Sequence, residues 1–293
     1  MEPIEYMRMT RELYSSLGHP PYGWCIADTP PAFTRLSKPL SESRIGLLAT
    51  AGAYVVGSRA YHYRDDTSIR RIPKSTPTEN IHFAHITENY LPDPRRDPNC
   101  VFPIDALRAL EAEGFIGELA EDLFSCMGGI YSQRRVHAEL IPALSEAFRK
   151  QKVDAVLLVP MCPVCHQTAT LIARHLEAEG TPTMVMASAL DIVKAGRAPR
   201  ISFVDHPLGH TVGKPFNRTE QLDIVRRGLS GIETMTQAEQ VDIQPIRWAE
   251  TEDWKAEEWK KGGAGGKDER KPRDGTPQYQ TEQDRILAET EKV

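Results

Sequence analysis

The sequence predicts an α/β protein with a doubly wound, mainly parallel β-sheet and a helical N-terminal extension. Short apolar runs bounded by turn residues alternate with segments whose apolar residues recur at three- and four-residue spacing. Runs that are apolar throughout are typical of strands buried on both faces, and their alternation with helices is typical of a parallel sheet. We therefore expect a flavodoxin-like, three-layer arrangement with helices on both faces of the sheet.

Five runs rich in β-branched or aliphatic residues are predicted to be the strands. They lie at residues 45–50, 81–86, 153–159, 183–186 and 201–205. Amphipathic segments are predicted to be the helices, and they lie at residues 104–113, 132–152, 167–179 and 219–229. Together these elements define an α/β domain over residues 41–248, preceded by the helical extension of residues 1–40.

Composition excludes several classes of protein. The chain has 293 residues, 40% of them apolar, and a net charge of −5 from 36 basic and 41 acidic residues, so it can bury a sizeable core. It has no apolar run of about 18 residues, and charges interrupt the apolar positions of its first residues, so we expect no membrane span and no secretory signal. It also has no Lys/Arg-rich stripe, which argues against a nucleic-acid partner. Five cysteines are an odd number and too few for a disulfide framework, so we expect free thiols and a cytoplasmic location.

Residues 249–293 are predicted to form a charged, largely disordered tail. Positions 250–293 carry 12 acidic and 9 basic residues, 9 apolar residues and a glycine-rich break at 262–266. Such a segment buries too little apolar surface to offset its ordering entropy. Trp254 and Trp259 are expected to let its first turns touch the domain.

Polar and thiol side chains collect in the loops that follow the predicted strands. Ligands bind at the carboxyl ends of the strands in sheets of this class, so we expect these loops to share a pocket. The candidate residues in chain order are Thr50, Gly52, His85, Asn89, Cys162, Cys165, Asp205, His206 and His210.

These loop residues have different candidate roles. Thr50 and Gly52 offer a hydroxyl and backbone N–H groups to a carboxylate, whereas His85 and Asn89 are candidates for direct substrate contact. Asp205, His206 and His210 are candidates for acid–base chemistry or for orienting a carboxylate. The alternative for each residue is a structural role in a turn.

Cys162 and Cys165 lie between a strand that ends near residue 159 and a helix expected to begin at His166 or Gln167. Free N–H groups and the dipole at a helix N-terminus favour a thiolate, which is the reactive form in nucleophilic attack and disulfide exchange. The spacing also lets the two thiols close into a disulfide. His166 is expected to be an exposed residue at the helix start.

Other interpretations of this cysteine pair remain open. A structural zinc site needs two further ligands with similar spacing, and Cys25, Cys100 and Cys126 are isolated, so we expect no metal. The Cys-x-x-Cys-His string matches a haem attachment pattern, but it lies inside a strand–helix unit. More than 150 residues precede the pair, which disfavours a thioredoxin-like domain. A buried pair without chemistry is the simplest alternative to a redox or nucleophilic pair, which the strand-end position favours.

An ordered set of motifs between about residues 44 and 229 resembles the selenoprotein B subunits of glycine, sarcosine, betaine and D-proline reductases. The main similarity is the segment 153–165 (VDAVLLVPMCPVC), followed by a helix that ends in Leu176-Glu-x-x-Gly180. Further matches are 97–103 (DPNCVFP), 105–110 (DALRAL), 114–117 (GFIG), 124–128 (FSCMG) and 203–209 (FVDHPLG). The length is closer to that of the shorter D-proline reductase subunit.

The resemblance implies reductive cleavage of a C–N bond next to a carboxylate in a small amino-acid-like substrate. Cys162 stands where the family has its nucleophilic selenocysteine, and Cys165 stands at the position of the resolving thiol. The family also implies a pyruvoyl group on a separate partner subunit, which activates the substrate amine, and a thioredoxin or dithiol donor. This chain has no evident pyruvoyl-forming segment, so we expect it to bind no cofactor of its own.

Two other functions stay open from the sequence. A cysteine is a weaker nucleophile than selenocysteine, so the chain is also consistent with a non-catalytic partner or regulatory subunit that keeps the scaffold. A cofactor-independent racemase with two opposed cysteines is the third hypothesis. It predicts that Cys162 or Cys165 faces Cys100 or Cys126 across a pocket. A homo-oligomer is compatible with each hypothesis.

Overall fold

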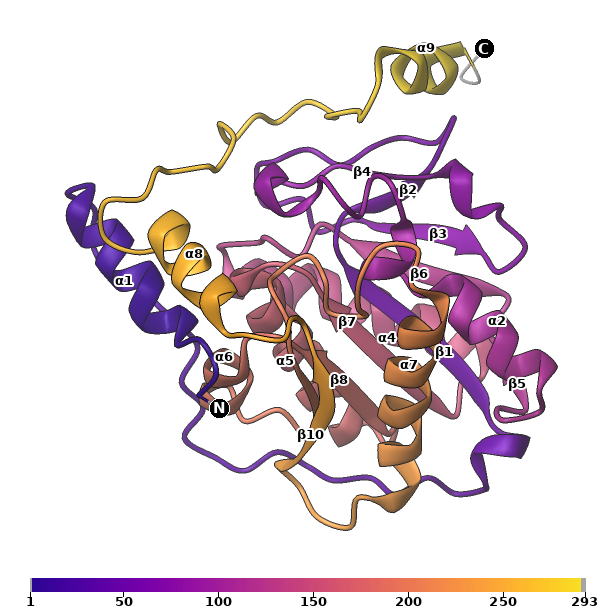
Figure 1. Cartoon of the computed structure of the whole chain (residues 1–293). Coiled ribbons are helices and arrows are strands. Elements are labelled where there is room, and N and C mark those ends of the chain that lie inside the picture. The colour runs from indigo at the N-terminus through magenta and orange to yellow at the C-terminus, as the bar shows by residue number, and fades with distance from the viewer. Residues whose placement is uncertain (1, 291–293) are drawn as a thin grey trace.

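The computed structural model describes residues 2–290 and has a mostly parallel central β-sheet with helices on both faces, which confirms the predicted fold class (Figure 1). The sheet has the strand order β10-β9-β8-β7-β1-β6-β3, and the short β5 also pairs with β1. All the pairings are parallel except that of β3 with β6. The strands are β1 (Arg44–Thr50), β2 (Ala53–Val55), β3 (Ile69–Pro73), β4 (Ile81–Phe83), β5 (Glu118–Leu119), β6 (Asp122–Cys126), β7 (Ala155–Pro160), β8 (Thr183–Ala187), β9 (Arg200–Asp205) and β10 (Gln240–Arg247).

Helices cover the sheet in two layers, and each layer encloses its own apolar core. The core on one face includes side chains of α2 and α7, and the core on the other face includes side chains of α4, α5 and α6. The helices are α1 (Tyr6–Ser16), α2 (Ile104–Ala112), α3 (Gln133–Arg135), α4 (Ile141–Gln151), α5 (Pro163–Ala178), α6 (Leu190–Ala195), α7 (Arg218–Thr234), α8 (Asp253–Gly262) and α9 (Glu282–Thr290). Among the described residues, no helix combines the length and the apolar character that a membrane span needs.

The structure differs from the predicted elements at three places. The run at 81–86 is not part of the main sheet, because β4 pairs with β2 in a separate antiparallel two-stranded sheet. In the main sheet, β6 pairs with β1 where a strand at 81–86 would be expected. The sequence of β6 is short and partly polar, so it does not stand out as a strand. The single helix expected over 132–152 is divided by a π-turn at Val136–Leu140, directly before α4, where Pro142 cannot donate a backbone hydrogen bond.

A buried ion pair ties α5 to the sheet and to the N-terminal extension. The Glu177 carboxylate pairs with the Arg200 guanidinium, and both side chains are fully buried. Glu177 also accepts the backbone N–H of Thr183 at 2.7 Å and that of Thr34 at 2.6 Å. The glutamate of the Leu-Glu-x-x-Gly pattern therefore joins three segments that are distant in sequence.

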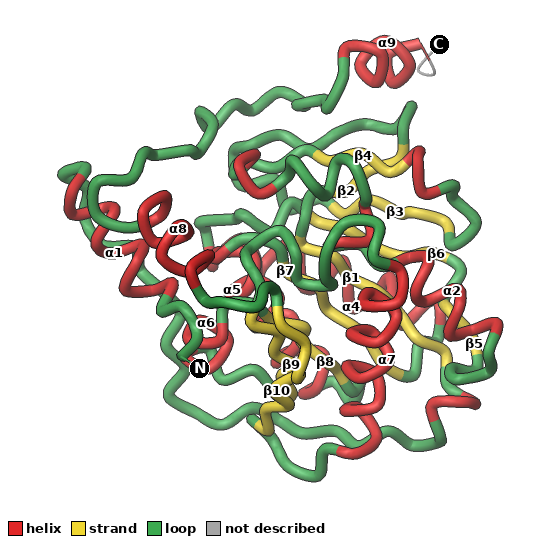
Figure 2. The backbone as a smooth tube through the Cα atoms, viewed as in Figure 1, coloured by secondary structure: helices red, strands yellow, loops and turns green. Residues whose placement is uncertain are grey.

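The two ends of the chain pack on each other beside the sheet, as Figure 1 shows for α1 and α8. Trp254 and Trp259 of α8 pack on an apolar cluster that includes Tyr6 and Met9 of α1. The C-terminal segment, residues 263–290, then crosses the domain as an extended loop and ends in α9 (Figure 2).

Within the tail predicted at residues 249–293, the structure describes α8, an extended loop and α9. Each end alone has little apolar surface, but together they enclose a small core, and the domain supplies hydrogen-bond partners for the rest. Residues 1 and 291–293, which belong to the predicted extension and tail, lie outside the described residues.

Candidate active site

A cavity of about 490 Å³ lies at the carboxyl ends of the parallel strands. The loops that follow β6, β7 and β9 line it, in agreement with the position expected for a ligand site in this fold class. Residues of α1, of the loop after it, and of positions 258–270 form the remaining walls. Both ends of the chain therefore help to enclose the cavity.

Cys162 lines this cavity at the N-terminus of α5. The helix begins at Pro163, three residues earlier than expected, because Cys162 itself acts as the N-cap residue. Its Sγ accepts the backbone N–H of Cys165 at 3.2 Å, and proline is well tolerated at the first helical position. The cap places the Cys162 sulfur in the field of a long helix, as the sequence position predicted.

The two cysteine sulfurs lie 2.7 Å apart, and both residues are free and buried. Burial by itself raises the pKa of Cys162, but hydrogen bonding from Cys165 and from His85 holds that pKa well below the usual thiol value. Burial and the interaction with the Cys162 sulfur raise the pKa of Cys165 well above it. These two shifts favour a thiolate on Cys162 over a thiolate on Cys165.

His85 completes this arrangement from the other side, because its Nε2 atom lies 3.2 Å from Cys165 Sγ. Its Nδ1 atom accepts the backbone N–H of Thr87 at 3.1 Å and contacts the Thr87 hydroxyl at 2.8 Å. A backbone N–H can only donate, so the proton of the neutral imidazole resides on Nε2. His85 therefore presents a hydrogen-bond donor to the Cys165 sulfur.

His85, Cys162 and Cys165 also form a group with ligand atoms within 4.8 Å of one another, so they are the residues that could hold a metal ion. A histidine that ligates a metal usually donates its other ring N–H to an acceptor. Here Nδ1 faces a donor instead, so the tautomer that the fold favours has no lone pair on Nε2 for a metal. The hydrogen-bond pattern suits thiol chemistry better than metal ligation.

His166 is fully buried, which corrects the expectation of an exposed residue at the helix start. Its Nδ1 donates to the Cys162 carbonyl at 2.7 Å, and its Nε2 accepts the backbone N–H groups of Ser188 and Ala189. Burial lowers the pKa of His166 to about 4, so the imidazole is neutral near pH 7. Its contacts fix the backbone of the cysteine loop to the loop after β8.

Two of the predicted substrate-contact residues do line the cavity. Asn89 lies in the loop after β4, and His210 lies in the loop after β9. His210 Nε2 lies 2.9 Å from Asp93 Oδ2, and Asp93 lines the cavity as well. In the same loop, Gly209 has a φ of +88°, and a Cβ there would lie 2.5 Å from the Tyr90 carbonyl oxygen, so this close approach needs glycine.

Thr50 and Gly52, which are predicted to contact a substrate carboxylate, are not among the residues that line the cavity. Thr50 donates its hydroxyl to the Cys165 carbonyl at 3.3 Å, and the Gly52 N–H donates to the Cys126 carbonyl at 2.9 Å. Gly52 has a φ of +72°, and a Cβ there would lie 2.0 Å from the Ala84 carbonyl oxygen. Both residues therefore pack the strand-end loops together.

Asp205 and His206 also have structural partners instead of cavity positions. Asp205 forms an ion pair with Lys255 of α8 at 2.5 Å. His206 is buried beside the Trp248 ring, and burial lowers its pKa to about 4. The His206 imidazole is therefore neutral, and it supports the loop that carries His210.

Aromatic side chains that the sequence did not single out form much of the cavity wall. They come from α1, from the loop after it and from the loops after β4 and β6, and they are Tyr14, Tyr22, Trp24, Tyr90 and Tyr131. Tyr22 packs edge-on against both Trp24 and Tyr131. The dense aromatic composition of residues 14–24 is the sequence signal for Tyr14, Tyr22 and Trp24.

The other cysteines do not reach the cavity, although all five belong to the described residues. Cys100 and Cys126 are fully buried in the two cores, and burial raises the pKa of Cys126 to about 12. Because Cys162 is the one cysteine of the five in the cavity wall, the structure does not provide the opposed pair that a two-cysteine racemase needs.

Comparisons with known proteins agree with the resemblance seen in the motifs. The family model for glycine/sarcosine/betaine reductase selenoprotein B matches residues 68–161, up to the residue before Cys162. The D-proline reductase subunit gamma of Acetoanaerobium sticklandii is 30% identical over 219 residues, which are 75% of this chain and 90% of that subunit. No solved structure matches the chain significantly.

Two further relatives are longer proteins. The sarcosine reductase complex component B subunit beta of Peptoclostridium acidaminophilum is 28% identical over 159 residues, 52% of this chain and 34% of the relative. The glycine reductase complex component B subunit gamma of Symbiobacterium thermophilum is 28% identical over 142 residues, 47% of this chain and 33% of the relative. The match therefore spans only about a third of the length of these two proteins.

Proposed function

This chain belongs to the family of selenoprotein B subunits of glycine, sarcosine, betaine and D-proline reductases, and we propose that it is a thiol-dependent catalytic subunit of such a reductase. Its relatives are components of amino-acid reductase complexes. In this proposal, Cys162 is the nucleophile in place of selenocysteine, and Cys165 is the resolving thiol.

The position of the two sulfurs relative to the cavity carries the proposal. Cys162 lines the cavity, whereas Cys165 does not line it and lies directly behind at 2.7 Å. A nucleophile must face the substrate, but a resolving thiol needs only to reach the first sulfur. The lowered pKa of Cys162 also supports its role as the thiol that reacts first, because the thiolate is the nucleophilic form.

The proposed reaction has two steps. The Cys162 thiolate attacks the carbon that bears the amine, so a C–S bond forms while the C–N bond breaks, and the nitrogen leaves with the electron pair and takes a proton. The Cys165 thiolate then attacks the Cys162 sulfur, so the disulfide forms while the C–S bond breaks, and the carbon takes a proton. The substrate gains two electrons, and an external dithiol or thioredoxin reduces the disulfide.

The cavity suits a small zwitterionic substrate with a carboxylate next to the C–N bond. Aromatic side chains such as Tyr22 and Trp24 line the cavity, and aromatic rings attract ammonium groups. Lys267 lines the same cavity and provides positive charge for a carboxylate, whereas Arg270 is paired there with Asp268. We propose that a pyruvoyl group on a partner subunit activates the amine as a leaving group, in keeping with the complexes formed by the relatives.

Amino-acid-dependent oxidation of dithiothreitol by the complex that contains this chain tests the proposal. D-proline, glycine, sarcosine and betaine form the substrate panel. Cys162→Ser keeps a good N-cap residue for α5 but removes the nucleophile, so we expect an unchanged circular dichroism spectrum and loss of turnover. Cys25→Ser is the matched control, because Cys25 is half-buried and lies outside the cavity wall. Full turnover by Cys162→Ser would contradict the proposal.

A further inference from the structure

The strand that leads to His85 has an open edge, and the C-terminal segment covers it. β4 pairs with β2 along one edge, in a sheet of two strands. On the other edge, the Phe83 backbone N–H donates to Gln280 Oε1 at 3.0 Å. A two-stranded sheet is only marginally stable by itself in water, so a contact on its free edge has a large effect on its geometry.

Two more contacts attach the C-terminal segment on either side of His85. The Asp284 carboxylate of α9 is buried, accepts the Tyr54 hydroxyl at 2.5 Å and lies 2.7 Å from His82 Nδ1. The Lys271 backbone N–H donates to the Ile86 carbonyl at 2.9 Å. The segment therefore holds the backbone or side chain of residues 82, 83 and 86.

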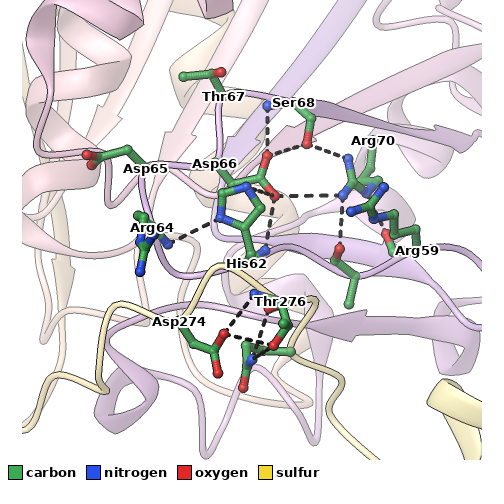
Figure 3. Close-up of polar contacts among 12 residues, drawn as sticks. Arg59, His62, Arg64, Asp65, Asp66, Thr67, Ser68, Arg70, Asp274 and Thr276 are labelled. Atoms are coloured by element: carbon green, nitrogen blue, oxygen red, sulfur yellow. Dashed lines mark hydrogen bonds and ion pairs between the residues drawn. The ribbon is translucent and has the colours of Figure 1, made fainter.

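The middle of the C-terminal segment is anchored on a rigid loop that Figure 3 shows beside Asp274 and Thr276. The Asp66 carboxylate organises this loop by accepting the His62 N–H at 3.0 Å and the Ser68 N–H at 2.9 Å. The Tyr63 backbone N–H donates to the Asp274 carbonyl at 2.9 Å. The path of the C-terminal segment across the domain is thus set by hydrogen bonds at several points rather than by its own apolar content.

We propose that the C-terminal segment positions the thiol pair, and that Gln280 and Asp284 are the residues through which it holds His85 against Cys165. The physical reason is that His85 lies between residues 83 and 86, which the C-terminal segment binds. The Nε2–H of His85 therefore points toward the Cys165 sulfur only while the segment holds β4 in place. Residues 267–270 of the same segment line the cavity. The same segment therefore both lines the cavity and holds the strand that leads to His85.

This inference rests on the proposed function, because it assigns positioning residues to the proposed nucleophile and its resolving thiol. Its test does not need turnover. The rate of Cys162 alkylation by iodoacetamide, measured against pH by mass spectrometry, reports the ionisation of the pair whether or not the chain reduces an amino acid. Failure of one proposal is thus distinguishable from failure of the other.

The variants are Gln280→Ala and Asp284→Ala, each compared with Glu282→Ala, whose side chain lies exposed on α9 and, among the described residues, pairs only with Arg285 of the same helix. We expect the midpoint of the alkylation profile to rise by about one pH unit in the first two variants and to stay unchanged in the control. Gln280→Glu keeps an acceptor for the Phe83 N–H and is expected to restore the original midpoint.

A second comparison places the effect at His85. In the His85→Leu background, Gln280→Ala should produce no further rise in the midpoint, because both changes remove the same contact. Equal rises in the two backgrounds, or an unchanged midpoint in Gln280→Ala and Asp284→Ala, overturn the proposal. The Gln280→Glu variant covers the case in which an alanine variant unfolds, since a midpoint that rises by about one pH unit in Gln280→Glu, relative to the original protein, also contradicts the proposal.

Discussion

His85 Nε2 lies 3.2 Å from Cys165 Sγ, although the two residues are 80 positions apart. The Thr87 N–H occupies the other ring nitrogen, so His85 can act on the thiol pair only as a donor while it is neutral. In the proposed reaction, Cys165 must ionise to attack Cys162 once Cys162 is bound to a substrate carbon. The proposal assigns to the His85 contact the stabilisation of that second thiolate.

Replacement of His85 should therefore change the ionisation of the pair. A thiolate is the species that reacts with iodoacetamide, so the alkylation rate rises with pH and levels off above the pKa. Because the pKa of Cys162 is lowered, its alkylation rate should level off at a lower pH than the alkylation rate of an ordinary free thiol. We expect His85→Leu to move the midpoint up by about one pH unit, and His85→Gln, which keeps an N–H donor, to move it less. An equal shift in both variants argues against a donor role.

Cys165→Ser should stop the proposed reaction after the first covalent step. The hydroxyl preserves the size and polarity of the side chain, but it cannot form a disulfide with Cys162. We expect a substrate-derived adduct on Cys162 in the intact mass of the chain after incubation of the complex with substrate. The Cys25→Ser variant should show no adduct in the presence of dithiol. Repeated turnover by Cys165→Ser is the contrary result.

Acid should destabilise the fold through His166 and His206. Burial lowers both pKa values to about 4 from an ordinary value of 6.5, so between these limits the unfolded chain binds more protons than the folded one. The free energy of unfolding therefore has its full value above pH 6.5, and it decreases as the pH drops toward 4. The loss is up to about 3 kcal/mol for each histidine.

Urea unfolding at a series of pH values measures this loss. We expect His166→Gln to flatten the dependence between pH 6.5 and 4, whatever its effect on stability at pH 7. His137→Gln, at an exposed position, serves as the control and should keep the slope of the original protein. An unchanged slope in His166→Gln excludes this histidine as a source of acid sensitivity.

Glu177→Gln should destabilise the domain strongly. The substitution keeps the shape of the side chain but leaves the Arg200 guanidinium charged and unpaired in a fully buried site. Loss of one partner of a buried ion pair costs about 3–5 kcal/mol. Equilibrium unfolding in urea gives the difference directly, and Glu179→Gln, at an exposed neighbouring position, should cost less than about 0.5 kcal/mol. A cost for Glu177→Gln as small as that of Glu179→Gln contradicts the structural role of the pair.

Much of the architecture could be predicted because it rests on local patterns. The strands around residues 45–50, 153–159 and 201–205 are buried on both faces, so their apolar runs are continuous and easy to recognise. β10 could not be found in this way, because it is an edge strand with a largely exposed and polar pattern. β6 is short and includes Ser125, so its sequence resembles a turn as much as a strand.

The sequence by itself determined the fold class, the family and the place of Cys162 and Cys165 at the start of a helix, since each depends on residues that are neighbours in the chain. Only the tertiary structure decided that His85 contacts the Cys165 sulfur, and that the two ends of the chain help to enclose the cavity. The physical reason is that local sequence records backbone preference and burial, whereas the direction of a side chain depends on partners brought close by packing. Thr87, Gln280 and Asp284 are such partners for the strand and loop that carry His85.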